Sequence, residues 1–163
     1  MIYPPLKRHV SLQPLSREHF GALVQARRLQ RAADGEPTGR TSAARGFAQA
    51  WRDELEPHFA DEERLLTPLI PQADLSQRLF NEHAILRSFA ADLSAGLNGT
   101  DHAADALRRL GQCLHDHIRW EERILFPAIE QAAGPAQLAA LGEQTAAIEM
   151  LRPGAARRPR KRR

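Results

Sequence analysis

His58-Phe59-Ala60-Asp61-Glu62-Glu63-Arg64-Leu65-Leu66-Thr67-Pro68 recurs further along the chain as His117-Ile118-Arg119-Trp120-Glu121-Glu122-Arg123-Ile124-Leu125-Phe126-Pro127. Histidine, a glutamate pair, arginine, a leucine and proline stand at the same offsets in both copies, which we call the first and the second cassette. A helix advances by about 100° per residue, so residues i and i+4 lie only about 40° apart on its surface. The histidine and the first glutamate of each cassette therefore project from one face of a predicted helix.

The helical pattern extends over most of the chain. Apolar stripes predict four long helices, which span Ser16 to about Ala33, Thr41 or Ser42 to about Ile70, Asp74 or Ser76 to about Leu97, and Asp101 to about Gln131. Asp34–Gly39 and Asn98–Thr100 are typical of loops, and residues 135–150 predict a shorter closing helix. Four amphipathic helices with short connections predict an all-α fold, an antiparallel up-down four-helix bundle with a short extra C-terminal helix.

Two details of these helices concern the cassettes. Pro57 falls inside the second helix, where it removes one backbone hydrogen bond, and we expect it to bend the helix just before His58. In the fourth helix, Ile124 and Leu125 are expected on the same apolar stripe as His117.

Length and composition predict one domain in residues 16–150, between an extended arm (1–15) and a basic, disordered tail (151–163). The chain has 163 residues, of which 42% are hydrophobic, 26% charged and only 6% aromatic, which favours helices. No apolar run approaches the roughly 20 residues that span a membrane, and residues 1–8 lack the apolar core of a secretory signal. Cys113 is the sole cysteine, which fits a reducing compartment. We expect a cytoplasmic protein with no membrane contact.

The tail accounts for the positive net charge of +3. Residues 152–163 contain seven of the 23 basic residues, which leaves 16 against 20 acidic residues in the rest of the chain. Such a tail can bind nucleic acid by releasing counterions. No aromatic or folded reader accompanies it, so a solvated tail is the favoured interpretation and nucleic-acid contact is the alternative.

Each of the four predicted long helices carries one histidine on its apolar stripe. These are His19, His58, His83 and His117, and the cassettes add Glu62 and Glu121. One histidine on an apolar face is usually a core residue, but four of them with two inward carboxylates need a cation, since burying unpaired carboxylates is costly. Imidazole and carboxylate suit iron, zinc and manganese alike. We therefore predict a metal site formed by all six side chains.

A ferritin-like di-iron bundle is disfavoured by the spacing. Its signature is Glu-x-x-His, at positions i and i+3 of a helix. No histidine of this chain has a glutamate three residues before it.

The motifs resemble those of the hemerythrin-like, or HHE cation-binding, domain family. The resemblance rests on Leu15-Ser16-Arg17-Glu18-His19, on both cassettes and on Asn81-Glu82-His83, and it covers about residues 14–131. It implies an up-down four-helix bundle around a non-haem di-iron centre with an oxo or hydroxo bridge. By this resemblance, His19 and His58 hold one iron, His83 and His117 hold the other, and Glu62 and Glu121 bridge them.

One position departs from the oxygen-carrying members of that family. They are similar except for a fifth histidine one turn after the histidine of the third helix, and Arg87 stands there in this chain. A fixed cation cannot ligate a metal. Reversible carriage of dioxygen is therefore not expected.

Several other polar residues near the cassettes are not among the six predicted ligands. Glu63 and Glu122 lie about 140° from their own cassette histidines and are expected in solvent, with a place behind the ligands as the alternative. Glu54 either orients His58 or sits at the bend made by Pro57. Cys113 is expected to be a small buried hydrophobe rather than an oxidisable thiol. His115 is predicted outside the site, and His9 and His102 at the surface.

The leading functional hypothesis is a non-haem metal-binding protein that binds or senses iron, dioxygen, nitric oxide or redox state. The ligand set is complete, and no further acid–base or substrate-binding motif accompanies it. Two alternatives stay open: a di-iron enzyme acting on peroxide or nitric oxide, and a structural interaction module with a nucleic-acid-binding tail. The ligands do not choose between iron, zinc and manganese.

Overall fold

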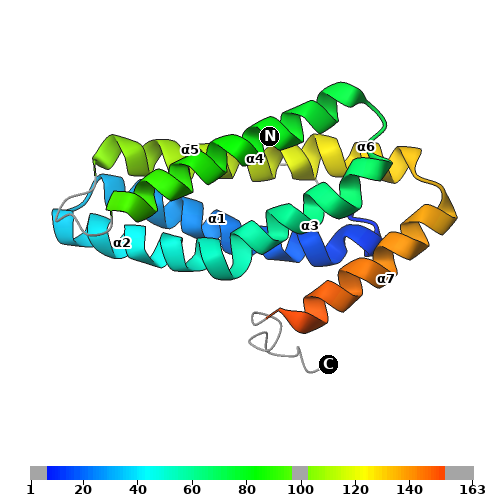
Figure 1. Cartoon of the computed structure of the whole chain (residues 1–163), viewed down its shortest axis with the longest axis horizontal. Coiled ribbons are helices and arrows are strands. Elements are labelled where there is room, and N and C mark those ends of the chain that lie inside the picture. Colours follow the sequence, from blue (N-terminus) through cyan, green and yellow to red (C-terminus); the bar gives the residue numbers. More distant parts are fainter. Residues whose placement is uncertain (1–6, 97–102, 153–163) are drawn as a thin grey trace.

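The computed structural model describes residues 7–96 and 103–152, and every regular element in these ranges is a helix (Figure 1). The α-helices are α1 (Gln13–Ala33), α2 (Pro37–Ala50), α3 (Glu56–Leu66), α4 (Ala73–Ala95), α5 (Ala104–Trp120), α6 (Phe126–Ala132) and α7 (Pro135–Leu151). Short 3-10 turns lie at Val10–Leu12 and Thr67–Leu69. The all-α prediction is confirmed. The turn predicted at Asn98–Thr100 lies outside the described residues.

Two π-helical turns join α2 to α3 and α5 to α6 without a break. They span Trp51–Leu55 and Glu121–Leu125, and each ends two residues before a proline, Pro57 or Pro127. Proline has no N–H, and its ring crowds the carbonyl group four residues earlier, so a wider turn accommodates it. The distortion expected before His58 takes the form of this wider turn.

The helix starts differ from the sequence-based expectation. α1 begins at Gln13 rather than after a cap at Ser16, and Pro14 stands in its first turn. α2 begins at Pro37, in a segment predicted as a loop, because proline is well suited to the first position of a helix. The predicted extended arm also contains the 3-10 turn Val10–Leu12.

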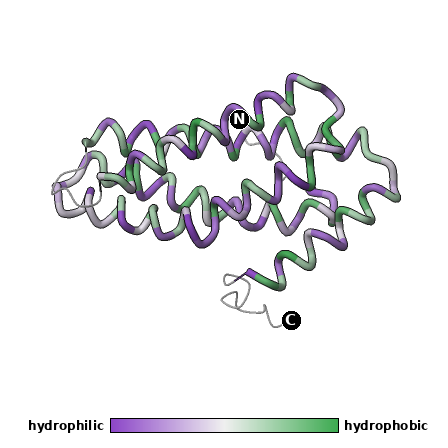
Figure 2. Tube along the Cα trace, viewed as in Figure 1, coloured by the Kyte–Doolittle hydropathy of each residue, from purple (hydrophilic) through white to green (hydrophobic). Residues whose placement is uncertain are grey.

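The helices surround two apolar clusters. α1 packs against α5 and α2, α4 packs against α2, α3 and α5, and α7 lies against the turn Val10–Leu12 and α1. One cluster includes Phe47, Phe59 and Leu114, and the other includes Leu66 and Phe126. Hydrophobic and hydrophilic positions alternate along the helices (Figure 2). No helix in the described ranges combines the length and the apolar character needed to cross a membrane.

The second π-helical turn changes which side chains face the core. Ile124, expected on the apolar stripe, is 51% exposed, whereas Leu125 is fully buried. The prediction for Ile124 is wrong because it assumed a regular α-helix beyond Glu121, where the wider turn begins.

Candidate metal centre

The six predicted ligands meet between the two apolar clusters. They are His19 on α1, His58 and Glu62 on α3, His83 on α4, His117 on α5 and Glu121 at the start of the second π-helical turn. In each long helix the histidine lies between a residue of one cluster and a residue of the other, as His83 does between Leu79 and Leu86. All six side chains are buried. The helices therefore place a polar layer between the two apolar clusters.

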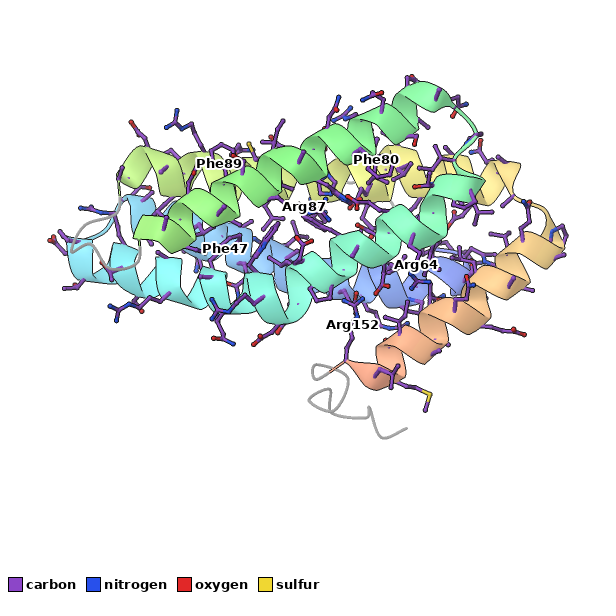
Figure 3. The ribbon with its side chains drawn as sticks, viewed as in Figure 1. Phe47, Arg64, Phe80, Arg87, Phe89 and Arg152 are labelled. Carbon is purple, nitrogen blue, oxygen red and sulfur yellow. The ribbon has the colours of Figure 1, made fainter. Side chains whose placement is uncertain are left out.

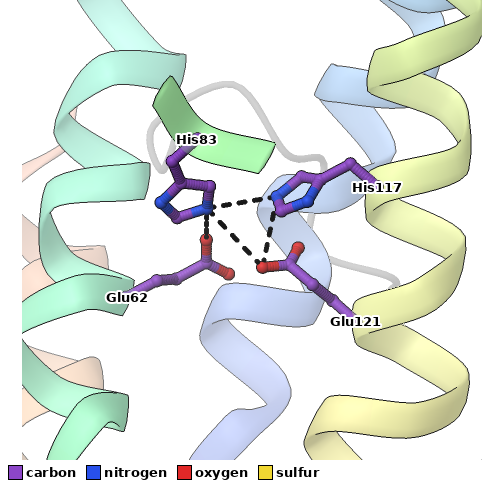
Figure 4. Close-up of side chains that lie close together, drawn as sticks. All are labelled: Glu62, His83, His117 and Glu121. Carbon is purple, nitrogen blue, oxygen red and sulfur yellow. Dashed lines mark hydrogen bonds and ion pairs between the residues drawn. The ribbon is translucent and has the colours of Figure 1, made fainter. Parts of the chain in front are cut away.

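The Nε2 atoms of the histidines point towards the two glutamates. Within each cassette, Nε2 of His58 lies 3.1 Å from Glu62 Oε1, and Nε2 of His117 lies 3.3 Å from Glu121 Oε1. Nε2 of His19 lies 3.3 Å from a carboxylate oxygen of each glutamate. The Nε2 atoms of His83 and His117 are 3.1 Å apart, as the close-up of this side of the centre shows (Figure 4).

The possible ligand atoms form two overlapping groups. One group is His19, His58 and Glu62, the other is Glu62, His83, His117 and Glu121, and the ligand atoms of each lie within 4.8 Å of one another. Glu62 belongs to both groups. The histidines thus fall into the pairs His19–His58 and His83–His117, with the two carboxylates between the pairs.

The centre contains buried polar atoms that have no hydrogen-bond partner. They are His58 Nε2, Glu62 Oε2 and both carboxylate oxygens of Glu121, and the only other such side-chain atom in the described ranges is Arg8 Nε. An unsatisfied buried polar group costs about 1–3 kcal/mol, and more when it is charged. A cation among these atoms would remove that cost. Imidazole nitrogens and carboxylate oxygens are ligands that suit iron, zinc and manganese, so the residues present fit a metal site.

The opposite ring nitrogen of every site histidine donates to a glutamate from another helix. The Nδ1–carboxylate distances are 2.6 Å for His19 and Glu122, 2.7 Å for His58 and Glu18, 2.9 Å for His83 and Glu63, and 2.8 Å for His117 and Glu82. We call these four carboxylates the outer glutamates. A carboxylate on Nδ1 fixes the ring orientation and leaves Nε2 free for a metal, the usual arrangement around metal-bound histidines.

The prediction that Glu63 and Glu122 lie in solvent is wrong. The 140° separation was measured from the histidine of the same cassette, but each glutamate serves a histidine of a neighbouring helix. Glu18, rather than Glu54, accepts the hydrogen bond from His58 Nδ1. A sequence signal existed, because every outer glutamate either directly precedes a site histidine or directly follows Glu62 or Glu121.

An arginine pairs with each outer glutamate in turn. The ion pairs are Arg8–Glu122 at 2.8 Å, Arg152–Glu18 at 3.2 Å, Arg87–Glu63 at 2.6 Å and Arg78–Glu82 at 2.6 Å. Arg87, at the position of the fifth histidine in the oxygen carriers, also pairs with Glu56 and lies between α4 and α3 (Figure 3). Sequence reasoning did not find the other three arginines. Four arginine–glutamate–histidine chains therefore converge on the centre.

In the metal-free centre, protonated histidines balance the negative charge of the buried glutamates. Burial alone would lower the pKa of these imidazoles, but the glutamates outweigh it and raise the pKa of His58 to about 9 and of His83 to about 10. Burial would raise the pKa of Glu62, but His58 and its neighbours hold it well below its usual range. The carboxylates are therefore ionised at neutral pH, and a metal ion has to displace protons from the imidazoles.

The remaining candidates lie away from the centre. Cys113 is partly buried against the first apolar cluster, and burial raises the pKa of its thiol, which agrees with a small packing residue. His115 is partly exposed and pairs with Asp116, as predicted for a residue outside the site. His9 is exposed, as predicted, and its ring accepts from the N–H of Ser11. His102 lies outside the described residues.

One comparison with known proteins gives a match. The family model of the hemerythrin HHE cation binding domain matches residues 74–153. This segment contains His83, His117 and Glu121, whereas His19, His58 and Glu62 precede it. No curated protein and no solved structure matches the chain significantly.

Proposed function

Residues 74–153 belong to the hemerythrin HHE cation-binding family, and from this premise we propose that the chain is a non-haem iron protein with two ions in one centre. His19 and His58 would hold one ion, His83 and His117 would hold the other, and Glu62 and Glu121 would be shared between them. The observation that carries the proposal is the set of buried ligand atoms without a hydrogen-bond partner at the meeting point of six side chains.

The same proposal includes the arrangement of the helices. α1, α2 with α3, α4, and α5 with α6 form an antiparallel up-down four-helix bundle, and α7 is the additional helix. The contacts between successive members of this set, and between α1 and α5, support it. We place the protein in the cytoplasm, where a chain with one cysteine and an iron centre is stable under reducing conditions.

The iron pair would supply open coordination positions for dioxygen, nitric oxide or peroxide and a change of oxidation state. The protein contributes orientation and the exclusion of water. Each outer glutamate accepts a hydrogen bond from an Nδ1–H group, which keeps the proton on Nδ1 and leaves Nε2 able to bind a metal. The same hydrogen bonds raise the basicity of the imidazole rings. Phe59 stacks on His83 with ring centroids 4.2 Å apart, and Phe126 stacks on His19 at 5.3 Å. These rings shield the layer of ligands from solvent.

Binding or sensing fits the centre better than turnover. Each outer glutamate is engaged by both a histidine and an arginine. A general acid or base has to exchange protons with a substrate, and carboxylates held in this way are poorly placed to do so. We therefore assign the chain a role in binding or sensing iron, a diatomic ligand or redox state.

Anaerobic reconstitution with ferrous iron tests the proposal directly. The wild-type chain should bind two irons, and the double variant His58→Ala plus His117→Ala should bind none tightly. His115→Ala removes a partly exposed histidine and serves as the matched control. A stoichiometry clearly different from two, or an unchanged iron content in the double variant, would overturn the proposal. Metal analysis of protein purified without chelator distinguishes iron from zinc and manganese.

An enzymatic function is the second candidate. Its support is Arg87, which stands where the oxygen carriers have a fifth histidine, so this chain would offer one ligand fewer to an ion held by His83 and His117. Stopped-flow decay of peroxide or nitric oxide by the loaded protein distinguishes the two functions. Decay no faster than with free iron would rule out an enzymatic function. Decay many times faster would support an enzyme in place of a sensor.

A role in nucleic-acid binding rests on the basic tail alone. Deletion of residues 153–163 leaves Arg152 and its ion pairs in place. Salt-dependent retention on DNA that survives this deletion would dismiss the tail as a nucleic-acid ligand.

A further inference from the structure

The four arginines behind the outer glutamates come from two kinds of segment. Arg78 and Arg87 belong to α4, a long helix that itself carries a ligand histidine. Arg8 precedes the turn Val10–Leu12, and Arg152 directly follows α7. The first two support His117 and His83 through Glu82 and Glu63, whereas the other two support His19 and His58 through Glu122 and Glu18. One histidine pair therefore depends on segments outside the four long helical rods.

Arg152 links the end of α7 to the two helices that carry His19 and His58. Its Nε lies 3.2 Å from Glu18 Oε1 on α1, and its Nη2 pairs with Asp61 on α3. Its guanidinium also donates to the backbone carbonyls of Glu54 and Pro57, at 3.4 and 3.3 Å. Figure 3 shows Arg152 between the end of α7 and α3. This side chain thus ties together the parts that fix His58.

Arg8 holds His19 by two routes. Its Nη2 lies 2.8 Å from Glu122 Oε2, and Glu122 accepts from His19 Nδ1. Its guanidinium carbon also lies 5.1 Å from the ring centroid of Phe126, the ring that stacks on His19. The Arg8 side chain is only 6% exposed. Its Nη1 also pairs with Glu130 on α6 at 3.1 Å, which holds the guanidinium beside Glu122. The loss of Arg8 should therefore be felt at His19.

We propose that Arg8 and Arg152 are positioning residues for the ion held by His19 and His58, which makes this ion the one released first when either segment detaches. The inference rests on the proposed two-ion centre and deepens it, because it predicts two unequal sites. Each arginine fixes an outer glutamate, and each outer glutamate fixes the orientation and the tautomer of one ligand imidazole. The His83–His117 ion keeps its support from α4 when the outer segments move.

Titration with Co(II), whose optical bands report the ligand geometry, tests this in the full chain. Arg152→Gln should weaken one of the two binding steps by about tenfold, the lower end of the effect of changing a partner behind a ligand. Arg78→Gln should weaken the other step. Arg64→Gln is the matched control, since Arg64 pairs with the same Asp61 but points into solvent. The control should bind both ions as the wild type does.

A second set of variants separates positioning from general stabilisation. If Arg152 acts through Glu18, Arg152→Gln combined with Glu18→Gln should weaken binding no more than Glu18→Gln alone. Arg152→Lys should restore only part of the affinity, because an ammonium group can pair with Glu18 but cannot span Asp61 and both carbonyls. Circular dichroism of the metal-free variants checks that they fold, and Glu18→Gln keeps the test usable if Arg152→Gln does not.

The outcomes are distinct. Equal weakening of both binding steps by Arg152→Gln and Arg8→Gln, or no weakening of either, would overturn the inference. A wild-type chain that takes up fewer than two Co(II) or Fe(II) ions would instead overturn the proposed function, before any variant is compared. A loss confined to one step, with an altered cobalt spectrum for that step, supports both.

Discussion

The two cassettes share their spacing but not their backbone. The first is α-helical through Glu62 and Glu63 and ends in the 3-10 turn Thr67–Leu69, whereas the second enters a π-helical turn at Glu121. The histidine–glutamate distances are nevertheless 3.1 and 3.3 Å. Only the turn between the histidine and the first glutamate has to be α-helical. The i, i+4 spacing therefore places the histidine and the first glutamate of each cassette together, whatever backbone conformation follows them.

The second glutamate of each cassette, Glu63 or Glu122, has an environment that the spacing does not determine. The Glu63 side chain is 20% exposed and its arginine partner 33%, while the Glu122 side chain is 10% exposed and its partner Arg8 only 6%. The second cassette is more deeply covered because the residues before α1 lie over it. Distant segments, rather than the repeat itself, set the environment behind the ligands.

The strongest test of this comparison substitutes the first glutamate of each cassette, Glu62 or Glu121, one at a time. Glu62→Gln should lower the affinity for both ions by more than about 100-fold, above the range for partners behind the ligands, because Glu62 belongs to both ligand groups. Glu121→Gln should also lower the affinity for both ions, but less for the ion at His19 and His58, because Glu121 belongs only to the ligand group of His83 and His117. Iron per chain after gel filtration measures both effects, and Asp105→Asn, at an exposed ion pair, is the control. Equal losses in the two variants would mean that the cassettes are equivalent.

The second test compares the outer glutamates of the two cassettes. Glu122→Gln should weaken metal binding by close to 100-fold and Glu63→Gln by nearer tenfold, about the two ends of the range for such partners. The difference follows from burial, because solvent can replace a lost interaction at Glu63 more readily than at Glu122. Competition with a chromogenic chelator gives both affinities. A larger loss of affinity in Glu63→Gln than in Glu122→Gln would show that burial does not determine how much an outer glutamate contributes to metal binding.

The sequence predicted which six side chains lie together because periodicity and spacing are local properties. His19 and His83 were found from the apolar stripe alone, and the cassettes supplied His58 and His117. The outer partners were missed for a physical reason: an angle measured on one helix says nothing about a neighbouring helix. Arg8 and Glu122 are separated by 114 residues in the chain, and no local pattern indicates such a contact.

The irregular helical turns were only partly predictable. Proline marks where a helix is disturbed, and both π-helical turns end two residues before one. Pro57 predicted a distortion, but its form depends on how the flanking helices pack. The start of α2 at Pro37 shows the opposite error, since a proline in a loop-like segment was the first residue of a helix.

The third test uses pH to compare metal-free and loaded protein. A histidine whose pKa is raised from about 6.5 stabilises the fold while it is protonated, so this stabilisation is complete below about pH 6.5 and is lost as the pH rises through about 9 to 10 at His58 and His83. The Tm of the metal-free protein should therefore fall between pH 7 and pH 10. Metal affinity should rise over the same range, because fewer protons have to be displaced.

The histidines of both cassettes contribute to this pH dependence. The pKa of His58 is raised to about 9, despite the opposing effect of burial, and that of His117 is also raised. NMR titration of the two imidazoles in the metal-free protein measures these values directly. A Tm that stays constant or rises from pH 7 to pH 10 would show that the buried glutamates do not hold protons on the histidines.

The smallest effect on metal binding is expected at Gly111, where the helix of the second cassette touches α1. A Cβ atom at this position would lie 2.7 Å from the carbonyl oxygen of Ala26 and 2.9 Å from Gln30 Cγ. Gly111→Ala should therefore lower the free energy of unfolding by about 1–3 kcal/mol, as overpacking does. Gly142→Ala in α7, where the nearest atoms lie at 3.6 Å, should be neutral or stabilising by up to about 1 kcal/mol. Urea unfolding of the metal-free proteins measures both changes.

Since the ligands of the second cassette lie more than a turn beyond Gly111, a loaded Gly111→Ala variant should keep both ions. Loss of the His83–His117 ion in that variant would show that the second cassette, unlike the first, depends on the approach of α5 to α1 rather than on its own spacing.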